Sequence, residues 1–321
     1  MLKYELGCEL SYNIGEPSTL IFNIGVVSNQ YQTIVQENLH CDSVQIEEYI
    51  TPIDRNRYLR INAPAGDLKI SYRSIVELTH DRLDPSQIME VDPANLPLDI
   101  LHYLYPSRYC QSDRLLRLAE TEFGNLVPGY ARVTAICNWI YARITYLSGS
   151  SDSFTSASDT VLERVGVCRD FAHLGIALCR ALNIPARFVS GYAYGLNPPD
   201  FHAWFEAYLG DRWYLFDPTR LSPQNGLVRV GTGRDAADAA FATIFGAVQM
   251  SQMKLFMNYL PTGQNSEQLP IFTTEAIATS WDPTPPMKWE VMTRLVNNFY
   301  SRKNITVSSQ TVADPLAESL M

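Results

Sequence analysis

The first 80 residues constrain the fold most, because short apolar segments follow one another there at the length and spacing of β-strands. Alternation is clearest at the end of this region, where Leu68, Ile70 and Tyr72 share one face of a strand and mostly polar residues occupy the other. Proline, glycine and asparagine interrupt the segments, as turns between strands require. We therefore expect an N-terminal antiparallel β-sandwich of six or seven strands. The predicted strands are residues 3–13, 18–27, 30–39, 44–51, 58–62 and 68–78.

After this region the pattern changes from strands to helices. Residues 81–106 contain four prolines and little periodicity, which is typical of a crossover between domains. Apolar residues then recur at helical spacing and three strands follow, so the second domain is predicted to be α+β. The predicted helices are residues 112–123, 128–144, 159–165 and 168–182, and the predicted strands are 186–194, 201–209 and 212–217. The predicted domains are residues 1–80 (β-sandwich), 81–110 (crossover), 111–260 (α+β domain) and 261–321 (C-terminal extension).

Charge and composition exclude several classes of partner. The 321 residues carry 25 Lys and Arg against 34 Asp and Glu, a net charge of −9, so nucleic acid is not expected as a partner. The first residues lack the pattern of a signal peptide and no apolar segment approaches 18 residues, so we expect no leader and no membrane partner. The six cysteines include no C-x-x-C pair, which favours free thiols and a cytoplasmic location.

Cofactor motifs are also missing from the sequence. There is no H-E-x-x-H, no paired C-x-x-C and no twelve-residue calcium loop, so no metal site is expected. The short segment Gly231-Thr-Gly233 lacks the lysine of a phosphate-binding loop. We therefore expect a protein that works without a cofactor.

Cys168 differs from the other cysteines because it lies where a long helix is predicted to begin. Phe171, Leu174 and Leu178 recur at helical spacing after it. The unpaired N–H groups and the positive end of the helix dipole favour the thiolate, which is the nucleophilic form of cysteine, and can also bind an oxyanion. We predict that Cys168 is a nucleophile. The other five are expected to pack as small apolar side chains: Cys8, Cys41, Cys110, Cys137 and Cys179.

His202 and Asp217 lie on two successive predicted strands. Alternation places His202 on the same face of its strand as Glu206. A tight turn at residues 210–211 then brings Asp217 to that face, with about 5–8 Å between the Cβ atoms of His202 and Asp217. This arrangement predicts a catalytic triad in which Cys168 attacks, His202 accepts its proton and Asp217 orients the imidazole.

Other residues near these motifs have simpler interpretations. His173 is expected to pack in the core or bind backbone, and Asp170 to complement the helix dipole. Trp204 could form either a wall of a substrate groove or part of the core. Glu206 is a second, weaker candidate for the acidic position of the triad.

The order of these motifs resembles the transglutaminase-like superfamily, in particular a bacterial branch of cysteine proteases. The similarity runs through residues 166–192 (GVCRDFAHLGIALCRALNIPARFVSGY), 202–204, 216–219 and 230–235. The β-rich N-terminal region also resembles the N-terminal domain of that branch, so the resemblance covers about residues 1–260. One departure is Arg169, which stands where glutamine is more frequent.

The resemblance implies a papain-like α+β core with the triad Cys168, His202 and Asp217. It also implies attack on a peptide or protein amide to form a thioester, which an amine or water then resolves. The chain would be a cysteine peptidase or amidase, or a protein-glutamine acyltransferase. We expect hydrolysis rather than transfer, since water needs no binding site.

Two features of the site and two other interpretations of the chain stay open. The resemblance does not assign the second oxyanion donor, and the calcium dependence of animal transglutaminases is not carried over. A rival interpretation is a non-catalytic protein-binding module that keeps the fold. A third interpretation is that the two domains serve a pathway that synthesises or processes peptides.

Overall fold

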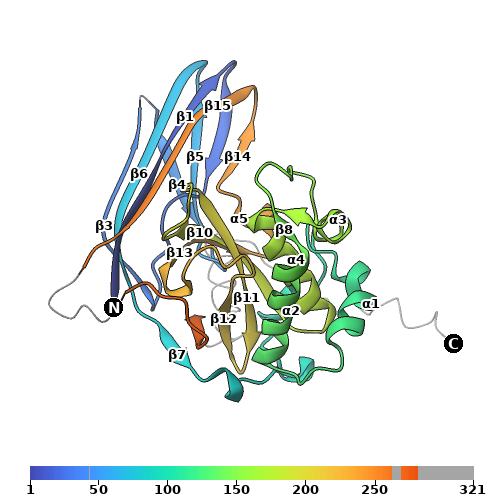
Figure 1. Ribbon diagram of the computed structural model, residues 1–321. Coiled ribbons are helices and arrows are strands. Elements are labelled where there is room, and N and C mark those ends of the chain that lie inside the picture. Colours follow the sequence, from blue (N-terminus) through green and yellow to red (C-terminus); the bar gives the residue numbers. More distant parts are fainter. Residues whose placement is uncertain (43, 262–268, 281–321) are drawn as a thin grey trace, which may run out of the picture. The chain divides into compact units, whose positions relative to one another are not determined.

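A computed structural model describes residues 1–42, 44–261 and 269–280 of the chain. Most of the predicted C-terminal extension, at 262–268 and 281–321, therefore lies outside the described residues. Within them the fold is α+β, as predicted: two antiparallel β-sheets stand beside a third sheet that is covered by helices (Figure 1). No helix in this part of the chain is long and apolar enough to cross a membrane.

Two four-stranded sheets form the β-rich part of the molecule, with strand orders β15-β1-β6-β3 and β14-β2-β5-β4. All six strands predicted in the first 80 residues are present. They are β1 (Leu2–Ile14), β2 (Ser18–Phe22), β3 (Gln32–Cys41), β4 (Ile46–Ile50), β5 (Arg57–Ala63) and β6 (Gly66–Leu78). Side chains that alternate inward, among them Leu6, Phe22 and Ile70, are fully buried in one apolar core. This core holds the two sheets together.

One of the two outer strands of each sheet comes from late in the described chain. Strand β14 (Ala242–Phe245) pairs with β2, and β15 (Val248–Tyr259) pairs along almost the whole length of β1. Figure 1 shows both strands, in orange, beside the blue N-terminal strands. Residues 242–259 thus extend the β-rich sheets, although the sequence analysis placed them in the α+β domain of residues 111–260. These pairings cover edges of β1 and β2 that would otherwise expose unpaired N–H and C=O groups.

The third sheet has six antiparallel strands in the order β13-β10-β11-β12-β16-β7. Its strands are β7 (Asp81–Leu83), β10 (Ala186–Ala193), β11 (Phe201–Leu209), β12 (Arg212–Phe216), β13 (Leu227–Gly233) and β16 (Ala276–Ser280). The three strands predicted in this part of the chain, β10, β11 and β12, lie together within the sheet. Strands β7 and β16 extend it from the predicted crossover and the predicted extension. Short 3₁₀ helices η1 (Pro85–Gln87), η2 (Pro93–Asn95), η3 (Leu101–Tyr103) and η4 (Gln224–Gly226) lie in connecting segments.

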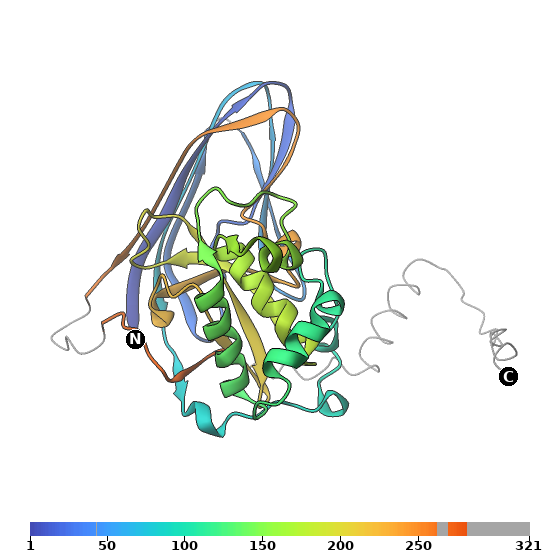
Figure 2. The same ribbon diagram turned by 45° about the vertical axis from the view of Figure 1, so that its right-hand side comes forward.

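Helices cover one face of this sheet, as Figure 2 shows for the green segments in front of the yellow strands. The helices are α1 (Ser112–Phe123), α2 (Tyr130–Arg143), α3 (Ala157–Glu163), α4 (Cys168–Ala181) and the short α5 (Ala236–Ala239). The first four agree with the prediction to within two residues at every end. A two-residue parallel pair, β8 (Thr145–Tyr146) and β9 (Val165–Gly166), leads into α4.

Helix α4 is the central helix, and it packs directly on β10 and β11. Every residue from Asp170 to Ala181 is buried. Gly175 lies where the helix meets the sheet, and a Cβ atom at this position would overlap the ring of Phe205 on β11. Glycine costs about 1 kcal/mol in a helix interior relative to alanine. The close approach of helix and strand explains why this helix carries a glycine.

We predict that Gly175→Ala destabilises the protein by about 1–3 kcal/mol, because the added methyl group overpacks the contact with Phe205. The free energy of urea unfolding measures the change. The double variant Gly175→Ala/Phe205→Leu should lose less than the sum of its two single variants. A gain in stability for Gly175→Ala, as helix propensity alone would give, contradicts the close contact.

Candidate functional site

Cys168 is the first residue of α4, as predicted, and its side chain is half-buried. The turn that carries it is fixed by Asp170, whose Oδ2 accepts a hydrogen bond from the backbone N–H of Val167 at 2.8 Å. The Asp170 carboxylate is fully buried, and a Cβ atom on Gly166 would lie 2.8 Å from the Asp170 Cβ. Asp170 therefore does more than complement the helix dipole: it caps the turn that presents the thiol.

His202 and Asp217 meet through the predicted hairpin. Leu209 pairs with Arg212 across a two-residue turn, and this register places Asp217 just beyond the end of β12, near the start of β11. The Nε2 atom of His202 lies 2.8 Å from Oδ2 of Asp217, and both side chains are almost completely buried. The sequence-predicted partners are thus in direct hydrogen-bond contact.

Thr219 completes the environment of the Asp217 carboxylate. Its backbone N–H and its hydroxyl donate to Oδ1 of Asp217 at 2.9 and 2.7 Å. Each carboxylate oxygen therefore has a partner, as a buried charge requires. Sequence reasoning did not assign this role to Thr219, although Asp-Pro-Thr is a typical side-chain-capped turn.

The two neighbours of His202 determine its charge. Burial lowers the pKa of His202, but the charge and hydrogen bond of Asp217 and the interaction with Cys168 outweigh burial and raise the pKa to about 10. The second ring nitrogen, Nδ1, is buried and has no hydrogen-bond partner among the described residues. With Nε2 held by Asp217, Nδ1 is the nitrogen left for the thiol. A protonated imidazole at neutral pH favours a thiolate beside it.

Cys168 and His202 both line a cleft of about 570 Å³. Its polar lining residues include Arg108, Ser151 and Arg169. Residues 236–237 and 239–243 form an apolar wall that runs into β14. A cleft of this size with a few polar groups is typical of a ligand site.

Tyr146 is a further polar residue beside the thiol. Strand β8 pairs Tyr146 with Gly166, and the ring packs on Phe171 at 5.8 Å between centroids. Its hydroxyl interacts with the side chain and the backbone of Cys168, and burial together with the charge of Cys168 raises its pKa. The phenol is therefore a proton donor at neutral pH. Sequence analysis missed Tyr146 because a two-residue strand leaves no periodic signal.

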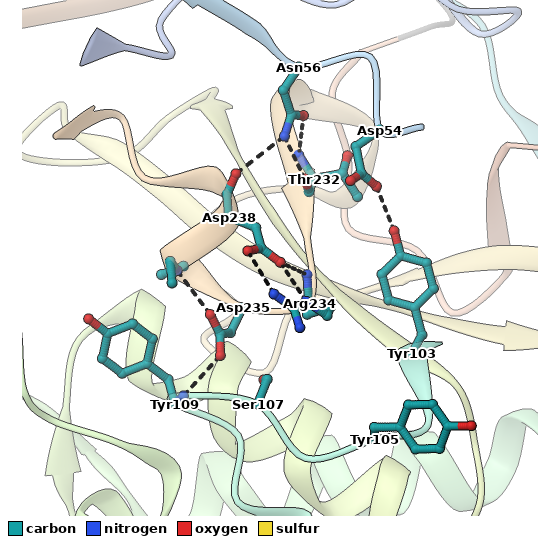
Figure 3. Close-up of polar contacts among 12 residues, drawn as sticks. Asp54, Asn56, Tyr103, Tyr105, Ser107, Tyr109, Thr232, Arg234, Asp235 and Asp238 are labelled. Atoms are coloured by element: carbon teal, nitrogen blue, oxygen red, sulfur yellow. Dashed lines mark hydrogen bonds and ion pairs between the residues drawn. The ribbon is translucent and has the colours of Figure 1, made fainter. Parts of the chain in front are cut away.

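The N-terminal sheets brace the apolar wall of the cleft (Figure 3). The Asn56 amide accepts from Thr232 N–H at 2.8 Å and donates to Thr232 C=O at 2.7 Å. Asp235 accepts hydrogen bonds from the backbone N–H groups of Tyr109 and Ala237, each at 2.9 Å. The segment 230–235, which sequence analysis singled out, is therefore a structural junction between the β-rich part, the crossover and the cleft.

The remaining candidates have structural roles. His173 packs parallel to Tyr109 at 5.0 Å and accepts from Ala236 N–H at 3.1 Å, as predicted. Burial lowers the pKa of His173, so the ring is neutral. Trp204 is buried in a core cluster and does not line the cleft.

Glu206 does not serve the triad. It is fully buried and pairs with Arg187 at 2.7 Å and with Arg229. Both carboxylate oxygens are therefore occupied, and the acidic partner of His202 is Asp217. Of the five cysteines predicted to pack, Cys41 is half-buried and the other four are buried: Cys8, Cys110, Cys137 and Cys179.

Comparisons with known proteins match both halves of this architecture. Residues 118–218 match the family described as the transglutaminase-like superfamily, and residues 2–98 match the bacterial transglutaminase N-terminal domain. A crystal structure described as "a Putative Cysteine Protease from Cytophaga hutchinsonii" is 44% identical in sequence. It aligns with a TM-score of 0.82 over 87% of this chain and 98% of that chain.

Two curated relatives are uncharacterized proteins of mycobacteria. The Mycobacterium leprae protein is 28% identical over 192 residues, which is 56% of this chain and 68% of that protein. The Mycobacterium tuberculosis protein is 39% identical over 209 residues, which is 56% of this chain and 65% of that protein. The match thus spans about two thirds of the length of these relatives.

The pairing of Cys168 with a protonated His202 predicts the pH dependence of thiol alkylation. In a Cys41→Ser background, iodoacetamide should react with Cys168 at pH 6 at least about tenfold faster than with an ordinary thiol. Asp217→Asn removes the charge that raises the pKa of His202, so less imidazolium forms and alkylation at pH 6 slows. If both proteins were alkylated at the rate of an ordinary thiol at pH 6, the pairing of Cys168 with His202 would be contradicted.

Proposed function

Because the chain belongs to the transglutaminase-like superfamily, we propose that it is a cysteine-dependent enzyme that hydrolyses peptide or protein amides through a thioester. The observation that carries the proposal is the placement of Cys168 and His202 in one cleft, with Asp217 holding the far nitrogen of His202. The description of the Cytophaga hutchinsonii protein as "a Putative Cysteine Protease" supports the same reaction class.

The first half of the proposed reaction forms the acyl-enzyme. The Cys168 thiolate attacks the amide carbonyl, so that a C–S bond forms and the carbonyl electron pair moves to oxygen. The protonated His202 gives its proton to the amide nitrogen, the C–N bond breaks and the amine leaves. Asp217 keeps Nε2 engaged throughout, so that Nδ1 is the nitrogen that transfers the proton.

Two donors are available for the oxyanion of this step. One is the backbone N–H of Cys168 at the start of α4, where the helix dipole is positive. The other is the Tyr146 hydroxyl, which lies beside the same N–H and thiol and carries a proton at neutral pH. We therefore assign Tyr146, as part of this proposal, to the second oxyanion donor that the sequence left unassigned.

The second half of the reaction releases the acyl group. Neutral His202 takes a proton from water, the resulting hydroxide attacks the thioester, and Cys168 leaves as the thiolate. An amine in place of water would give transfer instead of hydrolysis. Water needs no binding site of its own, so hydrolysis is the proposed outcome.

Turnover of casein separates these outcomes. Fluorescently labelled casein should be cleaved by the wild-type protein, and Cys168→Ala should lose all cleavage while it keeps the fold by circular dichroism. Addition of monodansylcadaverine tests for transfer, because an amine acceptor would become attached to casein. Binding of casein without cleavage or attachment would favour the protein-binding module instead.

The role of Tyr146 predicts a selective loss of rate. Tyr146→Phe keeps the ring on Phe171 but removes the hydroxyl, and kcat should fall about 100-fold with little change in KM. Steady-state kinetics on a chromogenic peptide amide measures both constants. Tyr105→Phe makes the same change at an exposed tyrosine in the crossover before α1 and is the control. An unchanged kcat in Tyr146→Phe would remove it from the oxyanion site.

A further inference from the structure

Strand β14 is an outer strand with an apolar, exposed surface. Among the described residues it pairs with β2 alone. Its four residues, Ala-Thr-Ile-Phe, include no charged side chain, and Ile244 and Phe245 are 38% and 59% exposed. Proteins usually protect such an edge, because its free N–H and C=O groups pair readily with other chains.

The opposite outer strand of the same sheet shows this protection. Strand β4 carries Glu47 and Glu48, which form ion pairs with Arg60 and Arg57 on the neighbouring strand β5. Charged side chains of this kind discourage the addition of another strand. The two outer strands of this sheet therefore differ: β4 carries charged side chains beside its exposed Tyr49 and Ile50, whereas β14 carries none.

The hydrogen bonds of β14 show which backbone groups face outward. Asn23 N–H donates to Phe241 C=O at 2.9 Å. The next pair in the ladder is Phe22 of β2 with Ala242 of β14. In an antiparallel ladder the bonded positions alternate, so Thr243 bonds β2. The N–H and C=O groups of Ala242 and Ile244 therefore point away from β2, along the free edge.

This free edge begins inside the cleft that holds the thiol. Ala242 and Thr243 line the cleft together with Cys168 and His202. The Phe241 ring, directly before β14, stacks on Phe201 at 4.8 Å between centroids and an interplanar angle of 17°. Phe201 directly precedes His202 on β11, so the start of β14 is held next to the strand that carries the histidine.

We propose that an extended segment of a peptide or protein substrate binds as an additional strand along the free edge of β14. This proposal rests on the proposed function, because the bound segment leads the acyl residue to Cys168. Four residues at about 3.4 Å each give an edge of about 14 Å, long enough to hold several residues beside the reacting amide. Main-chain pairing would supply affinity, and the apolar side chains of β14 favour apolar or β-branched residues in the substrate.

A proline at position 244 tests the pairing. Ile244→Pro removes an N–H that points outward and leaves the bonds between β14 and β2 in place, as edge positions tolerate. The matched control Ile244→Ala removes the side chain and keeps the N–H. For cleavage of labelled casein, kcat/KM should fall about tenfold in Ile244→Pro and clearly less in Ile244→Ala.

A small acyl donor separates this proposal from the proposed function. Acylation of Cys168 by p-nitrophenyl acetate, followed by p-nitrophenol release, needs no strand pairing and should be equal in the wild type and both variants. Equal casein rates in all three proteins, or equal losses in both variants, would overturn the β14 proposal while leaving the chemistry intact. Failure of the wild type to release p-nitrophenol or to cleave casein would instead contradict the proposed function.

The oligomeric state tests whether a second copy of the chain, instead of a substrate, occupies this edge. Light scattering should give the same mass for wild type and Ile244→Pro. A dimer that Ile244→Pro converts to monomer would assign the edge to a second copy of the chain and overturn the proposal.

Discussion

The packing of α4 across β11 is the contact on which the candidate site depends. Cys168 is the first residue of that helix and His202 is near the first residue of that strand, so the distance between them is determined by how the two elements cross. Gly175 permits the close crossing, and the buried Asp170 fixes the first turn. The geometry of the reactive pair is therefore produced by core packing rather than by a flexible loop.

Asp217 and Glu206 are buried carboxylates at two separate places on the third sheet, and the oxygens of each have hydrogen-bond or ion-pair partners. Asp217 is satisfied by His202 and Thr219, whereas Glu206 is satisfied by two arginines. The difference lies in the partners: an arginine pair keeps a charge permanently neutralised, but a histidine can release its proton. The Asp217 cluster opens, through His202, onto the cleft that Cys168 also lines. The group that can release a proton thus lies at the start of β11, beside the thiol.

Local patterns in the sequence predicted much of this site. Helical periodicity after Cys168, alternation around His202 and the two-residue turn before Asp217 act within a few residues, so they can be read without a structure. The apolar wall of the cleft could not be predicted in that way, because β14 owes its position to pairing with β2, over 200 residues earlier in the chain. Tyr146 and Thr219 were missed for a related reason: each acts through one contact and belongs to no periodic pattern.

The distant origin of β14 and β15 has a consequence for biosynthesis. At roughly 5–20 residues per second, on the order of ten seconds pass between synthesis of β6 and synthesis of β14. During that interval the edges of β1 and β2 lack their final partners, and the nascent chain carries two templates for wrong pairing. Because β14 also lines the cleft, the strand that covers the edge of β2 completes a wall of the cleft as well. A nascent chain that ends before residue 242 therefore lacks a finished cleft around Cys168.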